Sequence, residues 1–332
     1  MTSRQAGYVT PGTDNPPLAV LSVGNFDGVH RGHARLIGRA ARAARKIGAK
    51  CVAVTFKKPF GVRTGSALTS AEEKAALLIE AGADEVIALD GGNKLWRLSP
   101  EDFARKILLR LNPAAIVAGY DFRFGRNAAG KAQDLPAILR EAGRKIKLIV
   151  EKPLKHRGSI ISSSAARRAV ARGDVKTASR MLGRPYSVSG AKTSGAGLGA
   201  KLGFPTVNIN VPREKMLPAG IFACFASPAT DNRRPIMLKA AAYAGKSPTL
   251  LRLKKNRLEF HVISPEGFLN AVKDARKWKV FFIDKIRDDK KFASTRVLKK
   301  QIKKDIILAG GLLNKPSSKA KVKRGDPGMA TV

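Results

Sequence analysis

The sequence is poor in histidine, cysteine and aromatic residues. It has four histidines, two cysteines and 6% aromatic residues in 332 positions. Cys51 and Cys224 lie far apart in apolar runs, so we expect buried free thiols and neither a disulfide nor a cysteine metal site. Basic and aromatic residues do not interleave in any run, which argues against a platform on which single-stranded nucleic acid stacks.

Long apolar runs are also missing. No stretch approaches the roughly 20 apolar residues that a membrane-spanning helix needs, although 44% of the residues are hydrophobic, enough to fill sizeable cores. The residues before Leu18 are polar and lack the basic-then-apolar pattern of a secretory signal. We therefore expect a cytoplasmic protein, and the length predicts two domains of roughly 100–200 residues each.

Acidic residues are scarce. The sequence has 25 Asp and Glu against 63 Lys and Arg, which gives a net charge of +38. Such a charge attracts polyanions, including nucleotides, nucleic acid and acidic lipid surfaces. A solvated basic surface would explain it as well, so nucleic-acid binding is compatible with the charge but is not predicted as the function. The pattern does not predict an oligomeric state.

Apolar runs alternate with amphipathic segments up to about Pro185. The pattern predicts strands at 18–26, 51–56, 85–90, 114–120 and 145–152, and helices at 34–49, 69–82 and 99–111. Ser99 and Pro100 have the residue types of an N-cap and first helical position. Strands that alternate with helices imply a parallel, doubly wound, Rossmann-like sheet, which binds ligands beyond the carboxyl ends of its strands.

The pattern changes after Tyr186. Short strand-like runs are separated by glycine, proline and charged residues, which indicates a small antiparallel β-barrel or sandwich. A final helix is predicted at 294–310. We expect a first domain at 15–185, a second at 186–312, and a disordered basic tail at 313–332, where Lys, Ser, Pro and Gly dominate.

Two of the four histidines lie in one short stretch, SVGNFDGVHRGH, residues 22–33. The preceding strand and following helix put His30 and His33 at the carboxyl end of the first strand, beside the N–H groups of a helix N-terminus, which attract anions. Gly32 has no Cβ, so a phosphate can approach the backbone there. No third ligand lies at metal-binding spacing. Ordinary core histidines are the alternative.

GNFDGVHRGH resembles the signature of the HxGH nucleotidyltransferases, and in this form that of the bacterial bifunctional riboflavin kinase/FAD synthetases. The segments that resemble the adenylyltransferase domain of this family and the run into its second domain are 68–89, 99–108, 117–130 and 161–190. The segments that resemble its kinase domain, in order, are 202–209, 217–223, 245–249, 258–261 and 285–305. The resemblance covers nearly the whole chain.

The resemblance implies that the first domain converts FMN and ATP to FAD and pyrophosphate. His30 and His33 would be catalytic, contacting the ATP phosphates and stabilising negative charge. The implied ATP- and phosphate-binding residues are Gly24, Asn25, Asp27, Gly32, Ser162, Ser163, Ser164 and Arg167. Asp27 would organise the loop or a Mg²⁺ ion. Without the resemblance, the three serines would be a plain helix N-cap.

The same resemblance implies a flavin or nucleotide pocket in the first domain. Its residues would be Phe26, Phe56, Pro59, Asp121, Phe122, Phe124 and Gly125. The alternative for residues 121–125 is a turn packed against the core.

For the second domain the resemblance implies conversion of riboflavin and ATP to FMN and ADP. Thr206 and Asn208 would bind the nucleotide phosphates and Mg²⁺, since both offer oxygen ligands suited to a hard cation. Glu259 would be catalytic, accepting the proton of the ribityl hydroxyl. Without the resemblance, all three would be polar residues of strands.

The sequence departs from the family pattern mainly in this second domain. Ala200 and Ser247 stand where the family has arginine, Tyr243 stands where it has asparagine, and residues 268–271 differ from its Asp-Leu-Tyr-Gly. The first domain departs after Phe56, where the segment KKPFG keeps Pro59 but lacks the histidine of the family. The departures in the second domain, the +38 charge and this altered flavin segment leave one alternative each, in that order. The chain could be a monofunctional FMN adenylyltransferase with a degenerate kinase-like domain, a basic protein that binds flavin or RNA on this scaffold, or a nucleotidyltransferase for another phosphorylated substrate.

Overall fold

The computed structural model describes residues 16–58, 63–90, 93–195, 197–229, 236–246, 256–263 and 274–315. Pro59, Ser247, residues 268–271 and most of the predicted tail lie outside these residues. The chain forms two compact units. The first ends at Ser163 and the second begins at Ser164, except that Arg63–Leu68 belong to the second unit.

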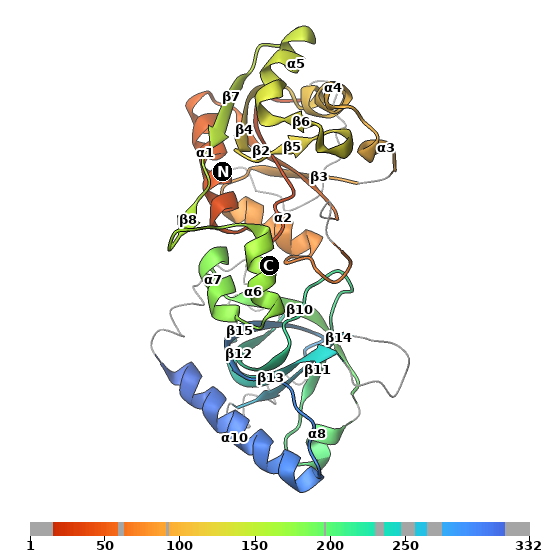
Figure 1. The fold of residues 1–332 in the computed structure, drawn as a ribbon, viewed down its shortest axis with the longest axis vertical. Coiled ribbons are helices and arrows are strands. Elements are labelled where there is room, and N and C mark those ends of the chain that lie inside the picture. The colour runs from red at the N-terminus through yellow and green to blue at the C-terminus, as the bar shows by residue number, and fades with distance from the viewer. Residues whose placement is uncertain are drawn as a thin grey trace. The chain divides into compact units, whose positions relative to one another are not determined.

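The first unit is built on a five-stranded parallel sheet (Figure 1), as predicted. Its strand order is β3-β2-β1-β4-β7, with β1 at the centre. The strands are β1 (Ala19–Val23), β2 (Lys50–Phe56), β3 (Glu85–Leu89), β4 (Pro113–Gly119) and β7 (Lys147–Glu151). Strands β2 and β3 lie on one side of β1, and β4 and β7 lie on the other. Sheets of this kind bind ligands where the strand order changes sides, so the expected ligand position is the carboxyl end of β1.

Both faces of this sheet are buried, which explains its nearly continuous apolar strands. Alternate residues of β1 belong to two separate cores, with Val20 in one and Leu21 in the other. Helices α1 (Arg31–Lys46) and α2 (Ala71–Glu80) cover the face of Val20. The helical residues after Ser99 and helix α5 (Leu135–Glu141) cover the other face.

The predicted helix at 99–111 is helical throughout but not regular. Ser99 caps α4 (Pro100–Phe103), as predicted, and accepts a hydrogen bond from the N–H of Asp102. The chain then widens to a π-helical segment, Ala104–Leu108, and tightens to a 3₁₀ turn, Leu109–Leu111. Asn112 ends it in the left-handed region with φ 45°.

The second unit contains a closed six-stranded antiparallel barrel (Figure 1), so the sandwich alternative is wrong. The strand order is β10-β11-β14-β13-β12-β15. The strands are β10 (Tyr186–Thr193), β11 (Val207–Asn210), β12 (Gly220–Pro228), β13 (Leu238–Lys246), β14 (Asn256–Val262) and β15 (Lys277–Arg287). Buried side chains that include Phe222, Phe260 and Phe282 fill its interior.

Three of the longer helices that the structure describes belong to the second unit. Nearly all of α6 (Ser163–Ala171) and the whole of α7 (Val175–Leu182) group with the barrel by their contacts. Helix α10 (Thr295–Asn314) begins after the cap Ser294 and runs four residues past the predicted end. Its buried Ala309 and Leu313 pack in a core with Phe225 and Phe281.

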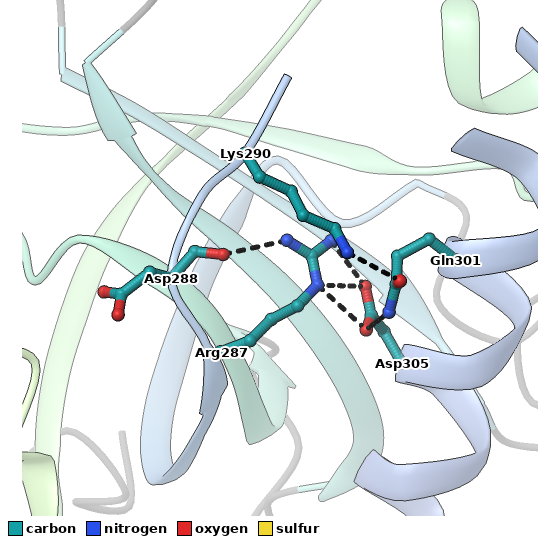
Figure 2. Close-up of polar contacts among 5 residues, drawn as sticks. All are labelled: Arg287, Asp288, Lys290, Gln301 and Asp305. Carbon is teal, nitrogen blue, oxygen red and sulfur yellow. Dashed lines mark hydrogen bonds and ion pairs between the residues drawn. The ribbon is translucent and has the colours of Figure 1, made fainter. Parts of the chain in front are cut away.

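A polar cluster attaches α10 to the end of β15. The Arg287 guanidinium donates to both carboxylate oxygens of Asp305, at 2.7 to 3.1 Å, and to the carbonyl of Asp288 (Figure 2). Gln301 donates to Asp305 at 2.9 Å and accepts from Lys290 at 3.0 Å. Asp305 is only 4% exposed, so its charge is neutralised by Arg287 rather than by water.

Both cysteines are free and buried, as predicted. Burial raises the pKa of the Cys224 thiol, so it packs as a neutral group. Among the described residues, none of the helices has the length and apolar character to cross a membrane.

Candidate active sites

The histidine-containing stretch forms a tightly curved loop between β1 and α1. Gly28 has a positive φ, as do Phe26 at 48° and Val29 at 35°. Positive φ is unfavourable for a β-branched residue such as valine, and such strain persists only where the surroundings impose it, often at ligand sites. The loop is therefore held in shape by its neighbours and not by its own preference.

His30 and His33 come together as predicted. His30 is the N-cap of α1, and its Nδ1 accepts a hydrogen bond of 3.3 Å from the backbone N–H of His33. The two rings stack with centroids 3.6 Å apart and planes 18° apart. The Phe26 ring meets His33 edge-on at 5.2 Å. A Cβ on Gly32 would lie 3.1 Å from the His30 ring, so this glycine also makes room for the histidine.

Asp27 holds the loop against the segment before α2. Its carboxylate is buried and accepts hydrogen bonds of 3.3 Å from both the N–H and the hydroxyl of Thr69. The Thr69 hydroxyl oxygen in turn accepts from the N–H of Gly28 at 3.1 Å. The structure therefore favours the loop-organising role of Asp27. Sequence reasoning missed Thr69, because no local pattern links residues 42 positions apart.

Lys74 of α2 is a second residue that sequence reasoning missed. Its side chain is buried, and Nζ donates to the carbonyl of Phe56 at 2.5 Å and to that of Asn25 at 3.3 Å. Burial lowers the pKa of Lys74 to about 8, while Asp27 acts in the opposite direction. A signal was present: Lys74, Ala75 and Leu78 recur at helical spacing, which puts the lysine on the buried face of α2.

The Ser162–Arg167 segment reaches the same loop through Ser163. The Ser163 hydroxyl donates to the backbone carbonyl of Asp27 at 2.8 Å. Ser163 is the first residue of α6, and Arg167 lies one turn later on the same helix face. Ser162 directly precedes the helix, and Ser164 is exposed. Ser163 therefore contacts the histidine loop directly, which a serine that only caps a helix would not do.

Gly24 and Asn25 form the start of the loop, directly after β1. The N–H of Gly24 donates to the carbonyl of Val54 at 3.0 Å, and a Cβ on Gly24 would lie 3.1 Å from the Phe26 ring. The carbonyl of Asn25 accepts from the Thr55 hydroxyl at 3.0 Å as well as from Lys74. The loop therefore leaves the sheet held by both β2 and α2.

The residues predicted to line a flavin or nucleotide pocket do not share one environment. Phe26 and Phe124 are buried in the two cores of the first unit. Phe122 stacks on Phe124 with centroids 5.6 Å apart, and a Cβ on Gly125 would clash with Pro100 at 2.7 Å. These contacts favour a packed turn at 122–125.

The predicted pocket residues Asp121 and Phe56 are more accessible to solvent. Asp121 is exposed. Phe56, at the carboxyl end of β2, is partly buried and pairs with Trp96 of α3 (Asn93–Trp96) at 5.2 Å. Sequence reasoning missed Trp96. Aromatic faces of this kind can stack on a planar ring system.

In the barrel, the residues predicted for phosphoryl transfer, Thr206, Asn208 and Glu259, lie close together, and Tyr243, which was not predicted to take part, lies beside them. Asn208, Glu259 and Tyr243 lie directly opposite one another on β11, β14 and β13. Their neighbours Ile209 and Phe260 fill the barrel interior, so this row faces outward. The Thr206 hydroxyl donates to one carboxylate oxygen of Glu259, and the Arg257 guanidinium donates to the other.

Close packing around the row explains two glycines. A Cβ on Gly195 would lie 2.3 Å from the side-chain amide nitrogen of Asn208, and one on Gly199 would lie 3.0 Å from the Thr206 hydroxyl. Tyr243, one of the departures from the family pattern, donates its hydroxyl to Asp289 at 3.0 Å. Burial and this hydrogen bond raise the pKa of Tyr243 to about 12. Sequence reasoning missed both Arg257 and Asp289.

Comparison with known proteins agrees with this division of sites. Residues 13–165 match the family model for FAD synthetase, and residues 182–313 match that for riboflavin kinase. A bifunctional riboflavin kinase/FMN adenylyltransferase from Pseudomonas fluorescens is 31% identical over 88% of this chain and 92% of its own length. The chain belongs to the bifunctional riboflavin kinase/FMN adenylyltransferase family. The resemblance identified from the sequence is thereby confirmed.

Other members and a solved structure extend the comparison. A member of this family from Escherichia coli (strain K12) is 30% identical over 87% of this chain and 91% of its own length. A crystal structure described as that of a macrolide-efflux protein from Streptococcus pneumoniae matches with a TM-score of 0.76 and 26% identity, over 90% of this chain and 95% of that one. The histidine loop lies in the part that matches FAD synthetase, and Thr206, Asn208 and Glu259 lie in the part that matches riboflavin kinase.

Proposed function

We propose that this chain makes FAD in two steps. The second unit transfers a phosphoryl group from ATP to riboflavin, which gives FMN and ADP. The first unit joins FMN and ATP, which gives FAD and pyrophosphate. The observation that carries the proposal is the stacked pair of His30 and His33 at the start of α1, in a chain whose barrel also carries the row of Asn208 and Glu259.

In the adenylyl transfer, an FMN phosphate oxygen attacks the α-phosphorus of ATP, and pyrophosphate leaves. His30, His33 and the N-terminus of α1 would stabilise the negative charge on the phosphates. Ser162, Ser163, Ser164 and Arg167 would hold the β- and γ-phosphates, since an arginine fork matches phosphate oxygens. Ser163 supports this arrangement because it contacts the loop directly.

In the phosphoryl transfer, the ribityl hydroxyl of riboflavin attacks the γ-phosphorus of ATP, and Glu259 accepts the hydroxyl proton. Glu259 already accepts from Thr206 and Arg257, but a carboxylate has about four lone-pair positions and can accept a further donor. We propose Mg²⁺ at Thr206 and Asn208, whose side-chain oxygens are hard ligands. A bound Mg²⁺ ion would neutralise charge on the nucleotide phosphates.

An assay with two substrates tests the proposal. The full chain receives either riboflavin and ATP or FMN and ATP, and the flavin products are separated. We expect His33→Ala to abolish FAD formation alone and Glu259→Gln to abolish FMN formation alone. A wild-type chain that converts FMN but never riboflavin would be a monofunctional adenylyltransferase.

Two further measurements, of RNA binding and of pyrophosphate release with other phosphorylated compounds, test the remaining alternatives. Salt-dependent RNA binding without pyrophosphate release would favour a basic binding protein. Adenylylation of a different phosphorylated compound, with FMN left unchanged, would favour another nucleotidyltransferase. The cytoplasmic location and the domain bounds of 15–185 and 186–312 stay predictions.

A further inference from the structure

Lys74 carries a positive charge into the interior of the first unit. It is 1% exposed and lies among Ala75, Leu77 and Leu78 on the buried face of α2. Removing an ammonium group from water is unfavourable unless hydrogen bonds compensate. An apolar side chain would fill the same space without that penalty, so the contacts of the ammonium group call for an explanation.

The two hydrogen-bond acceptors of Lys74 lie at the point where the ligand loop begins. Phe56 is the last residue of β2, and Asn25 follows β1 by two positions. Nζ donates to the carbonyls of both residues. The ammonium group therefore joins the carboxyl ends of two neighbouring parallel strands, at the edge where such sheets bind ligands.

This junction sets the course of the loop that ends in the histidines. Asn25 is followed by Phe26, whose φ of 48° turns the chain, and the Phe26 ring then contacts His33. Holding the carbonyl of Asn25 thus constrains the residue that positions the His33 ring. The carboxylate of Asp27 next to this turn accepts from Thr69. It is an acceptor, so it cannot supply the hydrogen bond that Lys74 donates to the carbonyl of Asn25.

The charge of Lys74 has the sign that a phosphate site needs. A positive charge in a region of low dielectric constant acts more strongly on a nearby anion than one in water. At neutral pH the group still carries its proton, since burial lowers its pKa only to about 8. The Asp27 carboxylate lies close enough to act on the pKa of Lys74, so the ammonium group offsets a negative charge beside the loop where phosphates would bind.

We propose that Lys74 is a positioning residue for adenylyl transfer. Its buried ammonium group holds the ends of β1 and β2 together, and it thereby orients His30 and His33 toward the triphosphate of ATP without touching the substrate. The inference rests on the proposed function of the first unit.

The test compares Lys74→Met, Lys74→Arg and Lys215→Met in the full-length chain. Lys215 is a matched control, because it is also buried, at 2% exposure, and its Nζ donates to the carbonyl of Leu68 at 2.8 Å within the second unit. Rates of FMN adenylylation and riboflavin phosphorylation are measured at neutral pH, together with the melting temperature of each variant.

We expect Lys74→Met to lower kcat for adenylylation on the order of 100-fold, because small misplacements of catalytic groups have effects of that size. The KM for ATP should change much less, and riboflavin phosphorylation should stay at the wild-type rate. Lys74→Arg, which keeps the charge and the donors, should recover part of the kcat. Lys215→Met should leave adenylylation unchanged.

Two outcomes would overturn the proposal. One is a wild-type kcat for adenylylation in Lys74→Met. The other is an equal loss of both reactions in this variant, which would mean that Lys74 supports folding in general. A wild-type chain that makes no FAD would instead contradict the proposed function, so the two failures are distinguishable.

Discussion

His30 accepts a hydrogen bond through Nδ1 from the backbone N–H of His33, while the two imidazole rings stack. An accepting Nδ1 carries no proton, so the proton of a neutral His30 ring resides on Nε2. Nε2 is then the ring atom of His30 that can donate to a phosphate oxygen. The helix cap thus selects the tautomer that the proposed chemistry uses.

Gly32→Ala should disturb this arrangement. Its Cβ would lie 3.1 Å from the His30 ring, so the ring must shift and its hydrogen bond from the N–H of His33 is strained. We expect kcat/KM for FMN adenylylation to fall about tenfold or more, with riboflavin phosphorylation unchanged. The measurement is the rate of FAD formation from FMN and ATP.

Gly38→Ala is the matched control, because it makes the same change in the same helix. The added Cβ would be 3.6 Å from the Arg42 side chain, an ordinary contact. It should stabilise α1 by about 0.5–1 kcal/mol and leave adenylylation intact. Equal rates in the Gly32 and Gly38 variants would show that the His30 position does not matter.

Lys74 predicts a specific dependence of stability on pH. Its pKa of about 8 in the folded chain lies below its ordinary value of 10.5. The unfolded chain therefore binds more protons between these values, and the wild type gains free energy of unfolding as pH rises through that window. Relative to Lys74→Met, the gain should be on the order of 3 kcal/mol.

Urea denaturation of both proteins at a series of pH values measures this difference. Subtracting the Lys74→Met result cancels the titration of the other lysines, which occurs in both proteins. Below about pH 8 the difference should be constant, because Lys74 is protonated in the folded and unfolded chain alike. A difference that does not change above that pH would contradict the prediction.

Gly195→Ala should impair the barrel site alone. Its Cβ would lie 2.3 Å from the side-chain amide nitrogen of Asn208, so this amide must shift although Asn208 keeps its strand position opposite Glu259. We expect the rate of riboflavin phosphorylation to fall about tenfold or more, while the conversion of FMN to FAD continues. Gly310→Ala in α10, where a Cβ meets no atom within 4 Å among the described residues, should leave both rates unchanged.

The ion pair between Arg287 and Asp305, which attaches α10 to β15, should contribute to the free energy of unfolding. Asp305→Leu leaves Arg287 without its carboxylate partner in a largely buried position, which should lower the free energy of unfolding by about 3 kcal/mol. The double variant Arg287→Met/Asp305→Leu should recover most of that loss, because no unpaired charge remains. Lys290→Met, whose pair with Gln301 is exposed, should change stability by less than about 0.5 kcal/mol. A double variant no more stable than Asp305→Leu would refute this account.

Much of the fold follows from local patterns in the sequence. The apolar strands of the first unit are recognisable because both faces of the sheet are buried. Helix α2 (Ala71–Glu80) follows the N-cap Ser70, which forms a capping box with Glu73, as the Ser-x-x-Glu spacing predicts. Helix α1 begins three residues before the predicted start, because the N-cap is His30, a residue type that is uncommon there.

The candidate sites depend on contacts between residues far apart in the sequence. The spacing around His30 and His33 is local, and it predicts their meeting. The pairs Asp27–Thr69 and Thr206–Glu259 span 42 and 53 residues, and only the strand order and register bring them together. The π-helical segment after Phe103, in which Ala104 and Leu108 are buried in a core of the first unit, also escapes prediction.

The chain order of the two units limits how they can be cut apart. Arg63–Leu68 belong to the barrel unit although the residues on both sides belong to the first. The backbone N–H of Ala67 donates to the carbonyl of Glu214, and the carbonyl of Ala67 accepts from the N–H of Met216. Leu68 supplies the carbonyl for the buried Lys215 ammonium group. A fragment that starts at Ser164 would retain Lys215 but lack that carbonyl. A separately expressed kinase part therefore needs a supplied 63–68 segment or an apolar residue at position 215.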